Sequence, residues 1–203
     1  AWDGEDRNGN GLLDAGEDLN GNGVLDAANG LLDAGEAPTV PGPRLAVAAG
    51  STSATIRVTN LVPEATSIVV PGQQASGLPV RDGAGRITSM APETATGSTA
   101  TYVFDNLRPG TFLYQSGSHP AVQVQMGLYG ALTVNAADAA AGTPAEAYPG
   151  TQYEADALLL FSEIDPALHD AVASGNYGPG KAVSSTIGYA PTIFLINGES
   201  FAP

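Results

Sequence analysis

The sequence predicts an all-β protein built as a sandwich or barrel, and three observations lead to this prediction. Short runs of β-branched and alternating apolar residues recur from residue 39 onward, with turn residues between them at spacings of about ten residues. The chain contains 26 glycines and 15 prolines, which suit a loop-rich β protein better than a helical one. Hydrophobic residues make up 43% of the sequence, enough to fill the core of a sandwich.

The expected strands of the sandwich follow one another within a domain at residues 39–136, and the residues before it, 1–38, form a separate segment. The expected strands are RLAVAA (44–49), ATIRVTN (54–60), TSIVV (66–70), TATYVF (99–104), TFLYQS (111–116), VQVQMG (122–127) and GALTV (130–134). Each run has the composition of a strand, and Gly, Pro or Asn separates it from the next.

The last part of the chain, residues 137–203, is expected to begin with a linker at 137–152. After the linker, ADALLLFSEID (155–165) and PTIFLINGESF (191–201) predict two further strands. PALHDAVASG (166–175) predicts a short helix or turn between them.

The charge of the chain favours cations as ligands. Twenty-one acidic residues against seven basic ones give a formal net charge of −14. A chain of this charge repels nucleic acids and anionic membranes, so we expect neither as a partner. Much of the acid lies in residues 1–36, which indicates a site for hard divalent cations there.

Cysteine is absent, which excludes disulfides, thiolate zinc sites and the thiolate of a type 1 copper centre. No apolar run approaches the roughly 20 residues that cross a bilayer, so we expect no membrane span. The first residues also lack the features of a signal peptide, so such a segment was either removed or never part of this chain.

The segment DRNGNGLLDAGE (6–17) matches the twelve-residue calcium loop position by position. Its expected ligands, at loop positions 1, 3, 5, 7, 9 and 12, are Asp6, Asn8, Asn10, the backbone carbonyl of Leu12, Asp14 and Glu17. Gly11 allows the sharp turn at position 6. Calcium takes about six to eight oxygen ligands in a flexible shell, and this spacing wraps one chain around one ion.

Two further copies follow without a break. DLNGNGVLDAAN (18–29) offers Asp18, Asn20, Asn22, the carbonyl of Val24 and Asp26, but has Asn29 in place of the last Glu. NGLLDAGE (29–36) keeps only the back half, with Asp33 and Glu36. Abutting copies leave no room for flanking helices. The segment resembles the tandem calcium repeats of dockerins and thrombospondin type 3 segments, and the alternative is a flexible Asn/Gly linker. Neutral Asn ligands predict weak affinity of the extracellular class, which favours a secreted, extracellular or cell-surface protein.

From residue 39 the sequence resembles the multicopper oxidase family. TVPGPRLAVAAGSTSATIRVTNLVPEATSIVVPGQ (39–73) is similar to the opening block of that family, and NLRPGTFLYQSGSHPAVQVQMGLYGALTV (106–134) is similar to a later block. LLLFSEID (158–165) and FLINGESF (194–201) resemble the start of a second domain of the same kind. The resemblance implies a cupredoxin-like Greek-key β-sandwich at 39–136, followed by the linker and first strands of a second cupredoxin domain. It also allows the calcium-binding repeats of residues 1–38 to be an insertion in a loop of that sandwich.

The resemblance also implies that the copper ligands are replaced. In the family the first block continues from TSI into H-x-H-G, and the later block carries H-x-H after its tyrosine. Here Val69 and Pro71 stand at the first pair of positions, and Gln115 and Gly117 stand at the second. Valine, proline and glycine have no side-chain donor atom, and glutamine is a poor copper ligand. We therefore expect no copper cluster in this chain.

The chain has two histidines, and neither predicts a catalytic site. We expect His119 to be a loop histidine hydrogen-bonded to the backbone, the alternative being a lone copper ligand completed by another chain. His169 is expected on a helix surface without chemistry, and Met126 is expected in the core rather than on copper.

Other catalytic patterns are not convincing either. Ser116 and Ser118 lie near His119 in the sequence, but close spacing is not the geometry of a nucleophile and its base. GNYGPGK (175–181) lacks the strand–loop–helix context of a phosphate loop. We assign no catalytic residue.

Two hypotheses about function remain open. The first is a copper-free cupredoxin scaffold that binds calcium and acts in an extracellular assembly. The second is one domain of a larger multicopper oxidase, which oxidises phenols or metal ions with dioxygen, whose copper ligands lie outside this chain. The resemblance implies strands beyond both ends, supplied by other domains of a longer chain or by neighbouring copies at open sandwich edges.

Overall fold

The computed structural model describes residues 39–76, 79–140 and 143–200, and within them a β-sandwich forms the main body. Its strands are β1 (Leu45–Val47), β2 (Ser53–Thr59), β3 (Ile68–Val69), β4 (Gln74–Ala75), β7 (Thr99–Asp105), β8 (Gly110–Ser116) and β9 (Tyr129–Val134). One sheet has the order β1-β9-β8-β3 and the other has the order β2-β7-β4. The predicted sandwich is confirmed.

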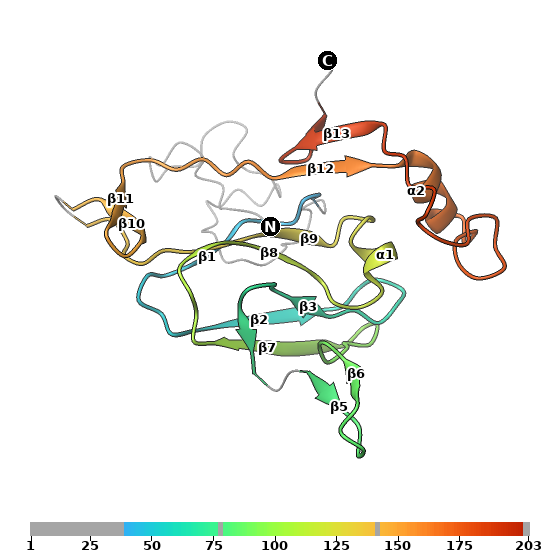
Figure 1. The fold of residues 1–203 in the computed structure, drawn as a ribbon, viewed down its shortest axis with the longest axis horizontal. Coiled ribbons are helices and arrows are strands. Elements are labelled where there is room, and N and C mark those ends of the chain that lie inside the picture. The colour runs from blue at the N-terminus through green and yellow to red at the C-terminus, as the bar shows by residue number, and fades with distance from the viewer. Residues whose placement is uncertain (1–38, 77–78, 141–142, 201–203) are drawn as a thin grey trace, which may run out of the picture.

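The two sheets stack face to face, with β8 and β9 in one layer and β2 and β7 in the other (Figure 1). Strands β1 to β4 alternate between the sheets along the chain, so neighbours within a sheet are often distant in sequence, as in a Greek key. All pairings in the sandwich are antiparallel except that of β1 with β9, which is parallel.

The core lies between the sheets and follows the alternation of side chains along each strand. In β7, Tyr102 and Phe104 are buried while Thr99 and Thr101 are exposed. Leu132 and Val134 of β9 meet them from the other sheet. Because successive side chains of a strand point to opposite faces, the TATYVF pattern buries one face and leaves hydroxyls on the other.

One predicted strand is wrong. Residues 122–127 were expected as a strand, but the chain forms helix α1 (Pro120–Gln123) and then turns up to Gly127. Proline at the first helical position has its φ already set for a helix, and its missing N–H costs nothing there. Gly127, with φ of 107°, then leads into β9.

Two hairpins were not expected. Strands β5 (Val80–Arg81) and β6 (Ile87–Ser89) form a hairpin that extends away from the sandwich in Figure 1. Strands β10 (Ala145–Tyr148) and β11 (Thr151–Tyr153) form another within the expected linker, which is therefore partly wrong. Its turn is Pro149–Gly150, and Gly150 has the positive φ that such a turn requires.

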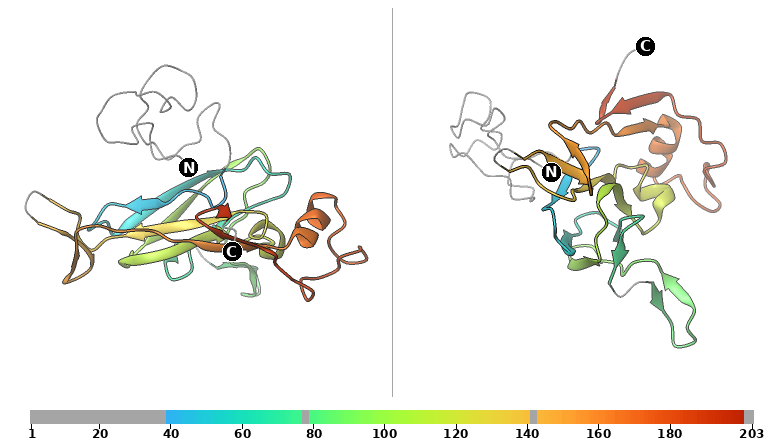
Figure 2. Two further views of the ribbon diagram at one scale, coloured as in Figure 1. Left: turned by 90° about the horizontal axis from the view of Figure 1, so that it is seen from above. Right: turned by 60° about the vertical axis from the view of Figure 1, so that its left-hand side comes forward.

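The C-terminal segment adds a small sheet and a helix. It contains β12 (Phe161–Ile164), α2 (Pro166–Ala173), β13 (Ile193–Ile196) and β14 (Glu199–Ser200), which confirms the predicted strand, helix and strand. This segment lies on the β8–β9 side of the sandwich, away from β2 and β7 (Figures 1 and 2). Neither of the two helices in the described residues has the length and apolar character that spanning a membrane requires.

Two contacts hold the C-terminal segment against the sandwich. The Arg44 side chain forms an ion pair with Asp156 at 2.5 Å and donates a hydrogen bond to the Thr133 hydroxyl. The turn at Gly198 lies so close to the Val40 carbonyl that a Cβ on Gly198 would overlap it. This segment is therefore seated on the loop that leads into β1.

Candidate functional site

The predicted calcium ligands all lie outside the described residues. They are Asp6, Asn8, Asn10, Leu12, Asp14, Glu17, Asp18, Asn20, Asn22, Val24, Asp26, Asp33 and Glu36. The calcium site therefore stays a prediction. Within residues 39–76, 79–140 and 143–200, no group of three or more His, Asp or Glu side chains is placed to hold a metal ion.

The four positions at which the resemblance places copper ligands can be located in the sandwich. Val69 at the end of β3 pairs directly with Gln115 of β8. Gly117 follows β8, and a Cβ there would lie 2.7 Å from Cγ1 of Val69. Pro71 lies past the end of β3 and is exposed. Three of the four positions thus meet at one end of the β3–β8 pair.

This end of the pair has no room for a side chain at position 117. Besides the contact with Val69, a Cβ on Gly117 would lie 3.0 Å from the Ser67 hydroxyl. Contacts this short require the neighbouring atoms to shift. The packing thus depends on glycine at 117 and on the small neighbours around it.

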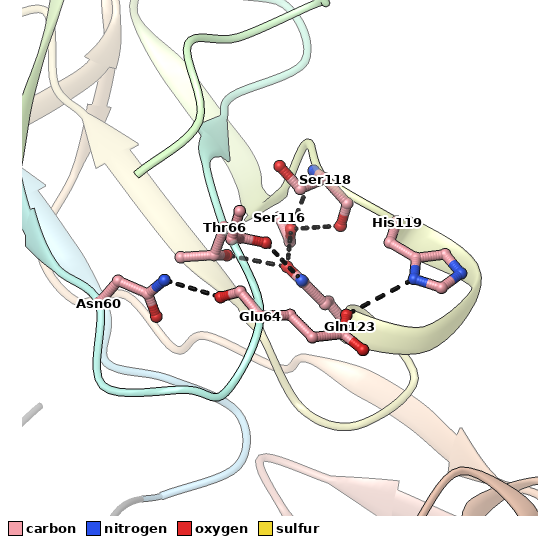
Figure 3. A network of polar contacts seen from close by, with 8 residues as sticks. Asn60, Glu64, Thr66, Ser116, Ser118, His119 and Gln123 are labelled. Atoms are coloured by element: carbon pink, nitrogen blue, oxygen red, sulfur yellow. Dashed lines mark hydrogen bonds and ion pairs between the residues drawn. The ribbon is translucent and has the colours of Figure 1, made fainter. Parts of the chain in front are cut away.

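A buried network of hydrogen bonds joins the chain segments around these positions, and Gln123 of α1 is its centre (Figure 3). The Gln123 Oε1 atom accepts hydrogen bonds from the Thr66 hydroxyl at 2.8 Å and the Ser116 hydroxyl at 2.6 Å. Its Nε2 atom donates to the Ala65 carbonyl at 2.8 Å. One side chain therefore ties α1 both to the end of β8 and to the loop before β3.

Two serines reinforce this connection. The hydroxyls of Ser67 and Ser118 lie 2.9 Å apart, and the Ser118 N–H donates to the Ser116 hydroxyl at 3.0 Å. All three serines are buried, each with at most 4% of its surface exposed. A hydroxyl that is buried and engaged with protein partners is not available as a nucleophile, so these serines connect the loops.

Asn60 fixes the loop that leads toward β3. It is 2% exposed, and its Nδ2 atom donates to the carbonyls of Glu64 and Thr94, at 2.7 and 2.8 Å. Its Oδ1 atom accepts from the Val62 N–H at 2.9 Å. A buried amide with three partners stabilises one loop conformation, because any other conformation would leave these groups unpaired.

Tyr114 anchors the residues just before β1. Its hydroxyl donates to the Pro43 carbonyl at 2.8 Å, and its ring lies directly against Gly130 of β9. Burial raises the pKa of Tyr114 above its ordinary value, so the phenol is neutral and acts as a donor. The adjoining cavity, about 280 Å³, has a largely apolar lining that includes Val58, Ile68 and Tyr114.

The two histidines differ from expectation. His119 is 56% exposed, and its Nδ1 atom lies 3.6 Å from the Glu64 carboxylate rather than on the backbone as predicted. His119 has a φ of 45° and precedes α1. His169 was expected on the surface of a helix. It lies in helix α2, but it is half-buried, and its Nδ1 atom is buried without a hydrogen-bond partner among the described residues. Met126 is half-buried in the turn after α1 and is not part of the core cluster.

Gln123 and Asn60 were not predicted from the sequence as residues of this site. Their partners lie in other segments, up to 58 residues away, so spacing along the chain does not reveal them. The one signal was that a glutamine interrupts an apolar run just after Pro120, where a helix can begin. Chemically, the network centred on Gln123 joins loops through neutral hydrogen bonds, and the neighbouring His119 imidazole lies near the Glu64 carboxylate outside these bonds.

Comparison with known proteins gives a consistent result. The model of the multicopper oxidase family matches residues 36–139, about half of the chain. The structure is similar to "Multicopper Oxidase mgLAC", with 20% identity and a TM-score of 0.54, and to the blue copper oxidase from Nitrosomonas europaea, with 22% identity and a TM-score of 0.53. Each likeness covers 81% of this chain and 46% of the other chain.

These likenesses show the fold, and they confirm the cupredoxin-like sandwich predicted from the sequence. The chain spans about half the length of these two structures. A comparison with curated proteins found no match.

Proposed function

This chain belongs to the multicopper oxidase family, and from that premise we propose that it is a copper-free, calcium-binding scaffold module of a secreted protein. The single observation that carries the proposal is the buried network at the end of β3 and β8. Val69 and Gly117, at two of the positions where the resemblance places copper ligands, are closely packed, and beside them the Thr66 and Ser116 hydroxyls donate neutral hydrogen bonds to Gln123.

The physical argument is that hydrogen bonds replace a metal as the connection between strands. A metal cluster links segments by binding a side chain from each, and a network with every group paired can do the same without an ion. Here the loop before β3, the end of β8 and α1 are connected through Ala65, Ser116 and Gln123. The sandwich therefore has no need of copper in order to fold.

Calcium is the proposed resident ion, through the acidic repeats at 6–17, 18–29 and 29–36. The support is the sequence pattern and the net charge of −14. Sites of this kind, with several neutral ligands, fill at the calcium concentrations found outside cells, which supports an extracellular location.

The proposed partners are other domains of a longer chain or neighbouring copies of this chain. Among the described residues, β2 pairs only with β7, so one edge of this seven-residue strand has no neighbour. Unpaired strand edges accept further strands from other segments or chains. This edge is the longest of the sandwich that is open within the described residues.

A second candidate function is one domain of a larger multicopper oxidase whose copper ligands lie outside this chain. The observation that favours it is that the chain covers 46% of two solved oxidase structures. In that case the whole protein would oxidise phenols or metal ions with dioxygen. This chain would then be a structural domain of the enzyme that contributes no copper ligand.

A copper reconstitution experiment tests the copper-free part of the proposal. The 203-residue chain should stay colourless with Cu(II) and show no turnover of phenols, ferrous ions or manganous ions. Restoring both histidines of the first motif, with Val69→His and Pro71→His, should not produce activity, because the cluster needs further imidazoles. A blue band or turnover in the unmodified chain would refute the proposal.

Isothermal titration calorimetry with calcium tests the calcium-binding part of the proposal. We expect binding in the millimolar class, and we expect Asp6→Ala to weaken it more than Asp18→Ala, since only the first loop has its final Glu. Equal effects would indicate ions shared between the loops. An absence of heat at millimolar calcium would rule out the calcium site while leaving the copper-free sandwich untouched.

A further inference from the structure

A cavity of about 390 Å³ lies between the sandwich and the C-terminal segment. It is bordered by the outer face of the β8–β9 sheet, by the turn after α1, and by β12 and α2. The lining residues used below are Leu113, Val124, Gln125, Leu160, Ser162 and Glu163. Leu113 faces outward, because its neighbours Phe112 and Tyr114 pack toward the core.

Unpaired polar atoms gather around this cavity. Three buried side-chain atoms in the described residues have no hydrogen-bond partner: Gln125 Nε2, Ser162 Oγ and His169 Nδ1. Gln125 and Ser162 line the cavity from the sandwich and from β12, respectively. His169 is not part of the lining. Buried polar groups are almost always paired in folded proteins, so two unpaired groups in one lining indicate a missing partner there.

The size and charge of the cavity restrict that partner. Its volume falls in the range of small-molecule sites, about 300 to 1,000 Å³. Glu163 is the only charged residue in its lining, and the chain has a net charge of −14, so anions are disfavoured. Leu113 offers apolar surface that is 50% exposed. These features favour a neutral ligand with an aromatic ring.

We propose that this cavity binds a small, neutral aromatic molecule with one carbonyl group that accepts hydrogen bonds. The ring packs against Leu113, Val124 and Leu160. The carbonyl oxygen accepts from the Ser162 hydroxyl and the Gln125 amide, which reach it by rotation about their side-chain bonds. The inference requires neither calcium nor copper and stands apart from the proposed function.

A titration of the full chain with 4-fluoroacetophenone, followed by fluorine NMR, tests this site. We expect saturable binding, and at least tenfold weaker binding of 4-fluorobenzoate, which has the same ring but carries a negative charge. Leu113→Trp fills the cavity and should weaken binding at least tenfold. Position 111 lies on the same exposed face of β8 but outside the cavity lining. The Thr111→Trp variant should therefore bind 4-fluoroacetophenone as tightly as the unmodified chain does.

Ser162→Ala supplies a second signature. Because it removes an unpaired buried hydroxyl, it should raise the Tm of the ligand-free chain while weakening ketone binding severalfold. A lowered Tm would show that Ser162 already has a partner, which contradicts the inference. An absence of saturable binding, or equal binding by Leu113→Trp, would also overturn it. So would a dimer that Leu113→Trp dissociates, because a second copy would then fill the cavity.

Discussion

Helix α1 and the turn after it lie between two regions that differ in how their polar groups are satisfied. Toward β3 and β8, Gln123 has three hydrogen-bond partners, and the surrounding serines, Thr66 and Asn60 are all paired. Toward β12 and α2, Gln125 and Ser162 each have a buried atom without a partner. Large apolar side chains such as Phe161 and Phe194 are also exposed there.

The difference shows which part of the molecule is complete in itself. The sandwich pairs its buried polar groups on the side of β3 and β8, so its stability there depends on its own residues. The C-terminal segment packs one side against the sandwich and leaves apolar surface and polar atoms for another partner. Substitutions of the same kind in the two regions should therefore have different effects on stability.

The largest effect is expected from two matched glutamine substitutions. Gln123→Leu leaves the Thr66 hydroxyl and the Ala65 carbonyl without a partner and removes one hydrogen bond of the Ser116 hydroxyl, and it should cost about 3 kcal/mol of unfolding free energy. Gln125→Leu, two residues away, removes an amide whose Nε2 has no partner and should change stability by less than about 0.5 kcal/mol, or raise it. Urea unfolding measures both. Equal losses would contradict the comparison.

A smaller effect is expected from two glycine substitutions. A Cβ at Gly130 of β9 would overlap the Tyr114 ring and disturb its hydrogen bond to Pro43, so Gly130→Ala should cost about 1–3 kcal/mol. Gly188, in the C-terminal segment, has no atom within 4 Å of where a Cβ would stand. Gly188→Ala should change stability by less than about 0.5 kcal/mol. Thermal unfolding of both variants checks the difference, which a neutral Gly130→Ala would disprove.

The smallest effect is local and depends on pH. The N–H groups of Ala190, Leu168 and Ala167 donate to the Asp165 carboxylate, and these hydrogen bonds hold the pKa of Asp165 below its ordinary value. Because the pKa of Asp165 is lower in the folded state than in the unfolded state, the ionised carboxylate stabilises the fold at pH values above its unfolded-state pKa, near 4. This stabilisation is lost as the pH falls through the folded-state pKa.

Hydrogen exchange, corrected for its intrinsic pH dependence, should therefore show that α2 and the residues near Ala190 lose protection in acid before β7 does. Asp165→Asn cannot be protonated, so it should remove this pH dependence. If α2 and β7 lose protection together in the unmodified chain, Asp165 does not act locally as described.

The sandwich was predictable because strand patterning is local. The alternation in 99–104 and 111–116 identified β7 and β8. The run at 122–127 was misassigned because its alternating residues suit a strand, whereas Pro120 starts a helix and the left-handed conformation at His119 turns the chain into it. The hairpins of β5–β6 and β10–β11 are too short for patterning to distinguish them from loops.

The candidate site was predictable only in part. Resemblance to the family located Val69, Gln115 and Gly117, and the structure brings these residues together. The network around Gln123 depends on the spatial approach of α1 to the loop before β3, which no local signal in the sequence encodes. The predicted calcium ligands lie outside the described residues and are open to experiment.

The central claim is that this member of the multicopper oxidase family is held together without copper. The most direct test is elemental analysis of the intact native protein after exhaustive treatment with a chelator and re-equilibration with calcium and trace copper. The account predicts calcium in stoichiometric amounts and copper at background level. Stoichiometric copper after this treatment would contradict the account.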